Sequence, residues 1–278
     1  MQLHAIDTGF FKLDGGAMFG IVPKTIWNKI NPADENNMCT WAMRCLLIEM
    51  GNRLILVDTG IGNKQDDKFF QYFYLHGGDT LEKSIRSKGY SPEEVTDVIL
   101  THLHFDHCGG AVKLENGKPT LSFPNAKYWS HSEHWAWALN PNPREKNSFL
   151  KDNILPIQES GHLNFINQEN DFADLGISFI TVSGHTEKQL VPKIQYKNKT
   201  LVYLADLMPS VGHLPIPYVL SYDVQPLLTL QEKEQMLQEA LKNEYIFMFE
   251  HDPKVECCTV QQTARGIREQ ETFPLAAI

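Results

Sequence analysis

A six-residue segment in the first half of the chain gathers four side chains of the kinds that bind metal ions. It reads His102-Leu103-His104-Phe105-Asp106-His107, and Gly109-Gly110 follows shortly after. Side chains two residues apart in extended chain leave the same face, so His102 and His104 are placed to hold one cation. The glycines permit a tight turn that directs Asp106 and His107 toward a second position nearby. This density of ligands predicts the centre of a metal site.

Three polar residues farther along the chain supply the remaining ligands. His185, Asp206 and His251 each follow an apolar segment that predicts a strand, and a metal keeps its geometry only when several segments contribute ligands. We expect His185 to join the first two histidines of the cluster, and His251 to join its last two ligands. Asp206, with two carboxylate oxygens, would bridge two ions about 3.5–4 Å apart.

Five predicted strands each end on a polar group. Strand ends are rigid supports for functional side chains, so we expect these ends to meet at one edge of a layered sheet structure. The first of these strands leads to Asp58-Thr59-Gly60, and the others lead to the ligands above. The strands are Arg53–Val57, Thr96–Leu100, Ile177–Val182, Thr200–Leu204 and Tyr245–Phe249.

Turn and cap residues indicate the connecting elements. Gly51-Asn52 predicts a hairpin that joins Cys45–Glu49 to the first of these strands, and Lys197-Asn198-Lys199 predicts a second hairpin. Helices are expected over Asp79–Lys88, from Ser91-Pro92 onward and over Thr229–Lys242. The sequence after Pro253 gives no clear pattern.

Composition narrows the class of protein. The chain has 278 residues and a formal net charge of -9, which disfavours nucleic acid as a partner because an acidic surface repels phosphate. The start carries no secretory-signal pattern and no stretch is apolar enough for a membrane span, so no membrane association is expected. Five cysteines without a disulfide pattern favour reduced thiols and a cytoplasmic location.

The ordered motifs resemble those of the metallo-β-lactamase superfamily. The motifs are Asp58-Thr59-Gly60, Thr101–Gly110, Gly184-His185-Thr186, Ala205-Asp206 and His251. The resemblance implies an α/β (α+β) fold, a four-layer αββα sandwich of two mixed sheets flanked by helices. It implies one domain over residues 1–278, with residues 1–44 as an amino-terminal extension that forms a lid or a dimer contact.

Two other segments resemble the branch that includes quorum-quenching N-acyl-homoserine lactonases. They are Gly15–Lys24 and Trp137–Asn142. The chain departs from this branch where relatives carry Pro-Gly-His after the second motif, since Glu187-Lys188-Gln189 stands here. It also has Pro209 near the place where several lactonases carry a tyrosine. Tyr218, Tyr222 and His213 are the candidates to replace that tyrosine, with Tyr222 and His213 placed among the catalytic residues.

The predicted chemistry is hydrolysis by a metal-bound hydroxide. A metal ion lowers the pKa of bound water from about 15.7 to about 7. Asp106 is the expected general acid or base, and Asp58 is expected to orient a ligand histidine or to cap its own turn. Two divalent ions are predicted, with zinc first and iron or manganese as alternatives.

The expected substrate is a small molecule with a lactone or ester bond. A phosphodiester, phosphotriester or thioester hydrolase of the same fold is the alternative, and a non-catalytic binding protein is a third reading. Met18, Phe19 and Trp27 are expected to form a lid, or else to lie in the core or in a homodimer contact. His131 and His134 are expected to be polar surface residues of a helix.

Overall fold

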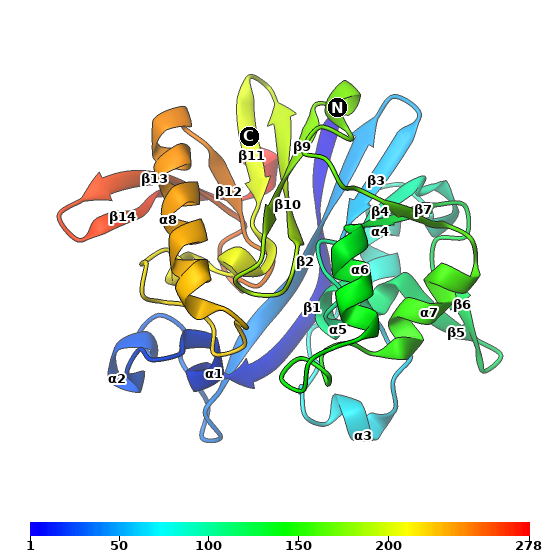
Figure 1. The fold of residues 1–278 in the computed structure, drawn as a ribbon, viewed down its shortest axis with the longest axis horizontal. Coiled ribbons are helices and arrows are strands. Elements are labelled where there is room, and N and C mark those ends of the chain that lie inside the picture. The colour runs from blue at the N-terminus through cyan, green and yellow to red at the C-terminus, as the bar shows by residue number, and fades with distance from the viewer.

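Two six-stranded mixed sheets form the centre of the protein (Figure 1). The computed structural model describes residues 1–278. The first sheet has the order β1-β2-β3-β4-β7-β8, with bounds Gln2–Asp14, Met38–Met50, Arg53–Val57, Asp97–Ile99, Lys127–Ser130 and Leu163–Phe165. The second has the order β14-β13-β12-β11-β10-β9, with bounds Gly266–Phe273, Cys257–Thr263, Ile246–Met248, Lys199–Tyr203, Gln189–Tyr196 and Ile177–Val182.

The first sheet is buried on both faces, and strand β2 shows why. Cys45 and Leu47 point into a core shared with helices, whereas Leu46 and Ile48 point into the core between the two sheets. Successive side chains of a strand leave opposite faces, so only a continuous apolar run satisfies both cores. That explains why this segment reads as unbroken hydrophobic sequence instead of alternating.

Helices cover the outer face of each sheet, which confirms the predicted αββα sandwich. α4, α6 and α7 contribute to the core outside the first sheet, and α8 contributes to the core outside the second. The helices are α1 Gly15–Phe19, α2 Lys24–Trp27, α3 Asp67–Phe70, α4 Leu81–Ser87, α5 Phe105–Cys108, α6 Ser132–Leu139, α7 Lys151–Glu159 and α8 Pro226–Asn243. A small separate hairpin comprises β5 (Val112–Glu115) and β6 (Lys118–Leu121).

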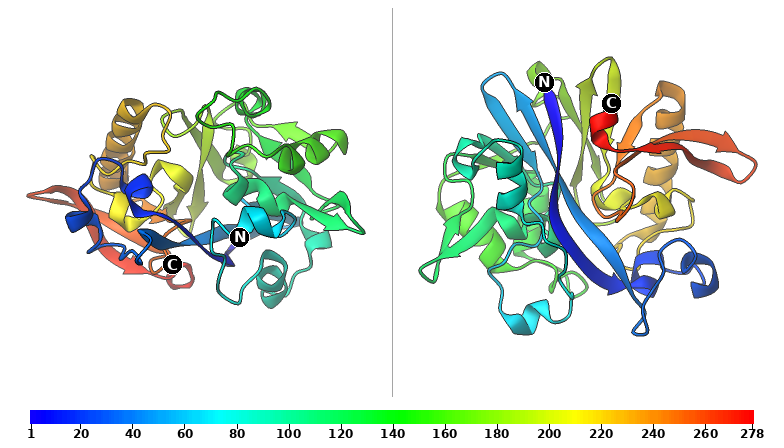
Figure 2. Two further views of the ribbon diagram at one scale, coloured as in Figure 1. Left: turned by 90° about the horizontal axis from the view of Figure 1, so that it is seen from below. Right: turned by 180° about the vertical axis from the view of Figure 1, so that it is seen from behind.

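Much of the first 44 residues lies within the first sheet. β1 pairs antiparallel with β2 from Gln2 opposite Glu49 to Asp14 opposite Met38, and the two strands run side by side in the view from behind in Figure 2. Only the segment between these strands, with α1 and α2, lies outside the sheet. Phe19 and Trp27 in it are buried and stacked on each other, 5.6 Å between ring centroids. The aromatic side chains of this segment therefore serve as core.

The predicted strands and helices are present, most with small changes of length, although β2 spans Met38–Met50 instead of the expected Cys45–Glu49. Helix α4 begins after Thr80, whose side chain caps it, and α8 extends the predicted helix to Pro226–Asn243. The expected helix after Ser91 is only a single 3₁₀ turn, Pro92–Glu94, because the chain turns at once into β4. All five cysteines are buried and free. None of the helices combines the length and apolar character that crossing a bilayer requires.

Candidate metal centre

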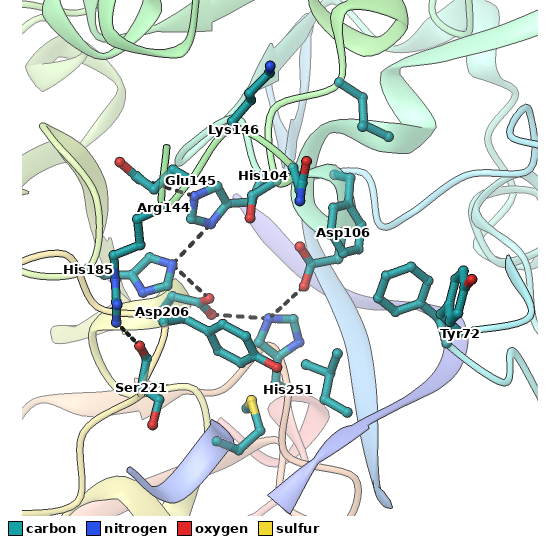
Figure 3. Close-up of a pocket in the computed structure, with 18 of the residues that line it drawn as sticks. Tyr72, His104, Asp106, Arg144, Glu145, Lys146, His185, Asp206, Ser221 and His251 are labelled. Carbon is teal, nitrogen blue, oxygen red and sulfur yellow. Dashed lines mark hydrogen bonds and ion pairs between the residues drawn. The ribbon is translucent and has the colours of Figure 1, made fainter. Parts of the chain in front are cut away.

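The predicted ligands lie in loops that leave the ends of strands. His102 and His104 follow β4, His185 follows β9, and His251 follows β12. Asp206 sits in a 3₁₀ turn, Ala205–Leu207, directly after β11. These strands belong to both sheets, so the site draws on the two halves of the sandwich. Figure 3 shows the labelled ligands facing one another across a common space.

The ligands form two adjacent groups, in the partition that their spacing predicts. One group joins His102, His104, His185 and Asp206, and the other joins Asp106, His107 and His251. Asp206 connects them, since one oxygen lies 3.1 Å from His185 Nε2 and the other lies 3.1 Å from His251 Nε2. All seven side chains are buried.

The donor atoms of these groups fit a metal cation. His251 Nε2 and His107 Nε2 are 3.1 Å apart, while the Nδ1 atom of each faces an oxygen: Ala42 O at 2.7 Å and Glu250 Oε2 at 3.0 Å, respectively. If each Nδ1 donates to its oxygen, two lone pairs face each other across 3.1 Å. Buried polar groups without partners are costly, and a cation between the two nitrogens removes that cost. His102 Nε2 is buried and has no hydrogen-bond partner at all.

Asp58 supports the ligand cluster through its contacts with Thr101 and His107. This matches the first of its two expected roles, the orientation of a ligand histidine. Its two oxygens accept hydrogen bonds from the backbone N–H and the hydroxyl of Thr101, at 2.8 and 2.6 Å. One of them lies 3.2 Å from His107 Nδ1. The residue has a positive φ of 58°, which turns the chain sharply after β3. Asp58 therefore positions both the strand end that carries His102 and the ring of His107.

Three buried carboxylates that sequence reasoning missed orient other ligands. Asp223 Oδ1 lies 2.9 Å from His185 Nδ1, Glu250 Oε2 lies 3.0 Å from His107 Nδ1, and Glu145 Oε1 lies 3.4 Å from His104 Nε2. Of these contacts the one with Asp223 is a hydrogen bond, and such a partner fixes the tautomer of a ligand histidine and raises its basicity. Glu250 directly precedes a predicted ligand, which is a signal in the sequence. Asp223 and Glu145 lie in irregular loops that carry no such signal.

His131 and His134 are both buried, which corrects their expected surface positions, and His134 contacts the segment that carries the metal-binding histidines. It is fully buried on α6. Its Nε2 accepts the backbone N–H of Leu103 at 2.8 Å, and its Nδ1 lies 2.5 Å from the carbonyl oxygen of Glu187. Burial lowers its pKa to about 3, so the ring is neutral. His134 thus connects the His102–His104 segment to the loop after His185.

Charge within the cluster favours a bound cation. Burial lowers the pKa of His102 well below its ordinary value, and neighbouring His107 and His104 add to the effect. Burial alone would raise the pKa of Asp206, but the histidines around it, His107 first, hold it well below the ordinary range. The Asp206 carboxylate is therefore ionised and the His102 ring is neutral, which are the states that bind metal. Against the effect of burial, the acidic side chains around them raise the pKa of His107, His185 and His251, so a bound ion would displace protons from these three rings.

Close backbone packing explains the glycines of the motifs. A Cβ at Gly109 would meet the backbone of Ile61, and one at Gly110 would meet the carbonyl of Thr59. The turn that carries Asp106 and His107 therefore lies tightly against the loop after β3. Gly184 is equally restricted, because a Cβ there would meet Thr229 of α8.

A cavity of about 740 Å³ opens onto the ligands. Asp106 and Tyr222 both line it, together with five other predicted ligand or ligand-orienting side chains: His104, Glu145, His185, Asp206 and His251. Tyr222 is 39% exposed. Burial raises the pKa of the Tyr222 hydroxyl, and the nearby carboxylate of Asp106 adds to the effect, so the hydroxyl keeps its proton at neutral pH. Tyr218 packs in the amino-terminal core.

His213 does not line the cavity, which corrects its placement among the catalytic residues. It is 1% exposed and stacks on Phe19, 4.6 Å between ring centroids. Its Nδ1 lies 2.8 Å from the Ser210 hydroxyl and its Nε2 lies 2.8 Å from the carbonyl oxygen of Met18. Both nitrogens are thus occupied, and the side chain serves the core that supports α1.

The chain belongs to the metallo-beta-lactamase superfamily, whose family model matches residues 44–256. It is accordingly a metal-dependent hydrolase with a metallo-β-lactamase fold. An N-acyl homoserine lactonase of Bacillus cereus is 25% identical over 241 residues, which cover 82% of this chain and 86% of that protein.

Solved structures share the whole fold. A probable metal-dependent hydrolase from Staphylococcus aureus superposes with a TM-score of 0.88 at 27% identity, covering 98% of this chain and 96% of that one. AidC, described as a dizinc quorum-quenching lactonase, superposes with a TM-score of 0.80 at 23% identity, covering 98% and 95% of the two chains. At that identity the likeness to AidC concerns the fold alone.

Proposed function

We propose that the protein opens a lactone or ester bond with two divalent ions, most simply zinc, held in the two ligand groups. The observation that carries the proposal is the position of Asp206, whose two oxygens face one histidine of each group at 3.1 Å. A carboxylate in that position suits a pair of neighbouring cations. The N-acyl homoserine lactonase among the relatives supports the choice of bond.

The two groups would hold the ions, and the ions when bound would supply Lewis acidity and a water of lowered pKa. Residues of the protein supply proton transfer and stabilisation of the developing negative charge. Asp106 reaches the cavity beside His251, with 3.8 Å between Asp106 Oδ2 and His251 Nε2. From there it carries a proton to the departing oxygen. The protonated Tyr222 hydroxyl donates to the oxygen on which negative charge develops.

The cavity suits an acyl compound of moderate size. Its volume of about 740 Å³ lies in the range of small-molecule sites, and its wall is largely apolar near Phe69, Phe73 and Phe105. A carbonyl group could lie over the ligands with an apolar portion against this wall. Phosphodiester, phosphotriester and thioester hydrolysis remain the alternative within the same class of chemistry.

A substrate panel on zinc-loaded protein tests the proposal. It contains an N-acyl lactone, an aryl ester, a phosphodiester, a phosphotriester and a thioester at equal concentration. We expect the lactone or the ester to be cleaved with the highest kcat/KM, and metal analysis to find about two ions per chain. If the phosphodiester or the phosphotriester is cleaved faster, the protein is a phosphoester hydrolase and the proposal is wrong.

Asp106→Asn is the matched control for that panel. Loss of the proton carrier should lower kcat by roughly 10²–10⁴-fold, while circular dichroism shows an unchanged fold. If this variant turns over substrate at the wild-type rate, Asp106 does not transfer the proton. The observed activity then comes from another group or from a contaminant.

A further inference from the structure

The two sides of the cavity differ in character. One side is apolar and aromatic, and the opposite side carries two basic residues, Arg144 and Lys146. Figure 3 shows Tyr72 on the first side and Arg144 on the second, with the ligands between them, and Lys146 at the rim. Besides Tyr222, the apolar and aromatic lining residues are Leu13, Met18, Phe69, Tyr72, Phe73, Phe105 and Leu150.

The acidic residue between the two basic ones does not neutralise them. Glu145 is 2% exposed and turns inward. Its Oε2 accepts hydrogen bonds from the Trp137 ring at 2.8 Å and from the Asn142 amide at 2.6 Å, and its Oε1 accepts one from the Thr186 hydroxyl at 2.5 Å. The other carboxylates that line the cavity, Asp106 and Asp206, belong to the metal groups.

Arg144 and Lys146 therefore line the cavity without a carboxylate partner, and the Lys146 side chain extends outward from the ligands in Figure 3. Arg144 makes one side-chain hydrogen bond, from Nη2 to the carbonyl oxygen of Ser221, which leaves most of its donors free. Lys146 makes no side-chain hydrogen bond or ion pair, and both side chains are exposed. In a chain of net charge -9, two uncompensated cations beside the site make a local positive field that draws anions.

We propose that the natural substrate carries a carboxylate, which Arg144 and Lys146 bind while the scissile carbonyl lies over the metal ligands. This inference rests on the proposed function and names its substrate class. A guanidinium matches a carboxylate in shape and charge. Arg144 also contacts the loop that carries Tyr222, so an anion bound there sits beside the group proposed to steady the oxyanion.

Two esters that differ in one group test the proposal. 4-Acetoxybenzoate carries a carboxylate on the departing phenol, and 4-acetoxybenzamide is its neutral counterpart of the same shape. We expect zinc-loaded protein to favour the benzoate by about tenfold in kcat/KM, as charged hydrogen bonds allow. The preference should fall as salt rises from about 0.01 M to 1 M, because the Debye length shrinks from roughly 30 to 3 Å.

Variants locate the source of the preference. Lys146→Gln, which leaves the Arg144 contact with Ser221 in place, should reduce the ratio of the two kcat/KM values by about threefold, and the double variant with Arg144→Gln should bring it near one. Lys151→Gln removes the same charge from an exposed residue of α7 that does not line the cavity, and it should leave the ratio unchanged. A wild-type ratio near one, or equal losses in all variants, would overturn the proposal.

Failure of the proposed function is distinguishable from failure of this inference. If wild-type protein cleaves neither ester, both compounds stay intact and their binding is measurable by titration calorimetry. Tighter binding of the benzoate that is lost in Lys146→Gln but kept in Lys151→Gln would support the anion subsite on its own. Equal binding of both compounds would reject it.

Discussion

Three of the ligand histidines use one ring nitrogen to bind an oxygen of the protein. His251 Nδ1 faces a backbone carbonyl at 2.7 Å, and His185 Nδ1 faces the Asp223 carboxylate at 2.9 Å. His107 Nδ1 lies near two carboxylates. These contacts leave each Nε2 directed into the ligand groups. The chain thereby presets the orientation of its ligands before any ion binds, and loss of such a partner typically weakens metal binding 10–100-fold.

Tyr222→Phe tests the proposed oxyanion donor. The hydroxyl has no hydrogen-bond partner in the protein and lines the cavity, so its removal leaves packing intact. We expect kcat to fall by about 10²-fold, the lower end of the range for a lost oxyanion donor, with KM changed little. Stopped-flow or steady-state kinetics on the best panel substrate measure this. Tyr218→Phe is the control, because Tyr218 packs against the amino-terminal core. An equal fall of kcat in this variant would mean that the effect comes from general disturbance of the loop.

At this scale the ligands were predictable and their supports were not. His102 to His107 form a dense local pattern, and His185, Asp206 and His251 follow recognisable strands. Asp223 and Glu145 reach their histidines through irregular loops, whose paths no periodicity reveals. The prediction for His213 was wrong because the sequence does not show which way a histidine near the site points. In the fold His213 faces the core and not the cavity.

Among the elements, α8 holds the loop that supplies Tyr222 and Asp223. Lys233 of this helix is fully buried, and its Nζ donates to the carbonyl oxygens of Pro215, Ile216 and Tyr218 at 3.0, 3.3 and 2.7 Å. The Lys233 side chain thereby ties three carbonyls of this loop to α8. Burial lowers the pKa of Lys233 to about 7, although the charge of Asp223 opposes the shift.

Lys233→Met should therefore change the pH dependence of stability. Between pH 7 and the ordinary lysine value, about 10.4, the unfolded chain binds a proton that the folded chain has lost. The free energy of unfolding of the wild type should consequently rise with pH in this window, by about 2 kcal/mol from pH 7 to 9 relative to the variant. Urea denaturation of both proteins with a chelator present measures the difference.

Lys242→Met on the same helix is the control, because Lys242 is exposed. Its stability should follow the wild-type curve across the window. Parallel curves for wild type and Lys233→Met would mean that the buried lysine keeps its ordinary pKa.

Elements were predictable where both faces of a strand are buried. Arg53–Val57, buried at every position but the first, has the predicted bounds, because a short apolar run of this kind admits few other structures. β13 and β14 were not predicted, because Cys257–Thr263 and Gly266–Phe273 are rich in polar residues. They form the outer edge of the second sheet, where side chains need not be apolar.

At the scale of the whole molecule, the ligands connect the two sheets. The cluster with His102 follows a strand of the first sheet, and His185, Asp206 and His251 follow strands of the second. Removal of metal should therefore loosen the sandwich as a whole. With free zinc at about 1,000 times its Kd, the loaded protein should gain about 4 kcal/mol, which raises Tm by roughly 10 °C in a chain of this size.

Calorimetry of chelated and zinc-loaded protein measures that shift. His251→Ala should bind about one ion per chain and keep a smaller shift, because only the four-residue group stays complete. An unchanged Tm on chelation would mean that the ligands do not join the sheets energetically. The homodimer and the cytoplasmic location remain predictions.

The separation of the ligands along the chain also governs when the centre first exists. His107 and His251 lie side by side in the fold but 144 positions apart in sequence. A ribosome adds about 5–20 residues per second, so the nascent chain exposes the first cluster for roughly 7–30 s before its last partner is made. During that interval the early histidines and carboxylates are an incomplete chelate, and productive zinc capture has to wait for the final strands.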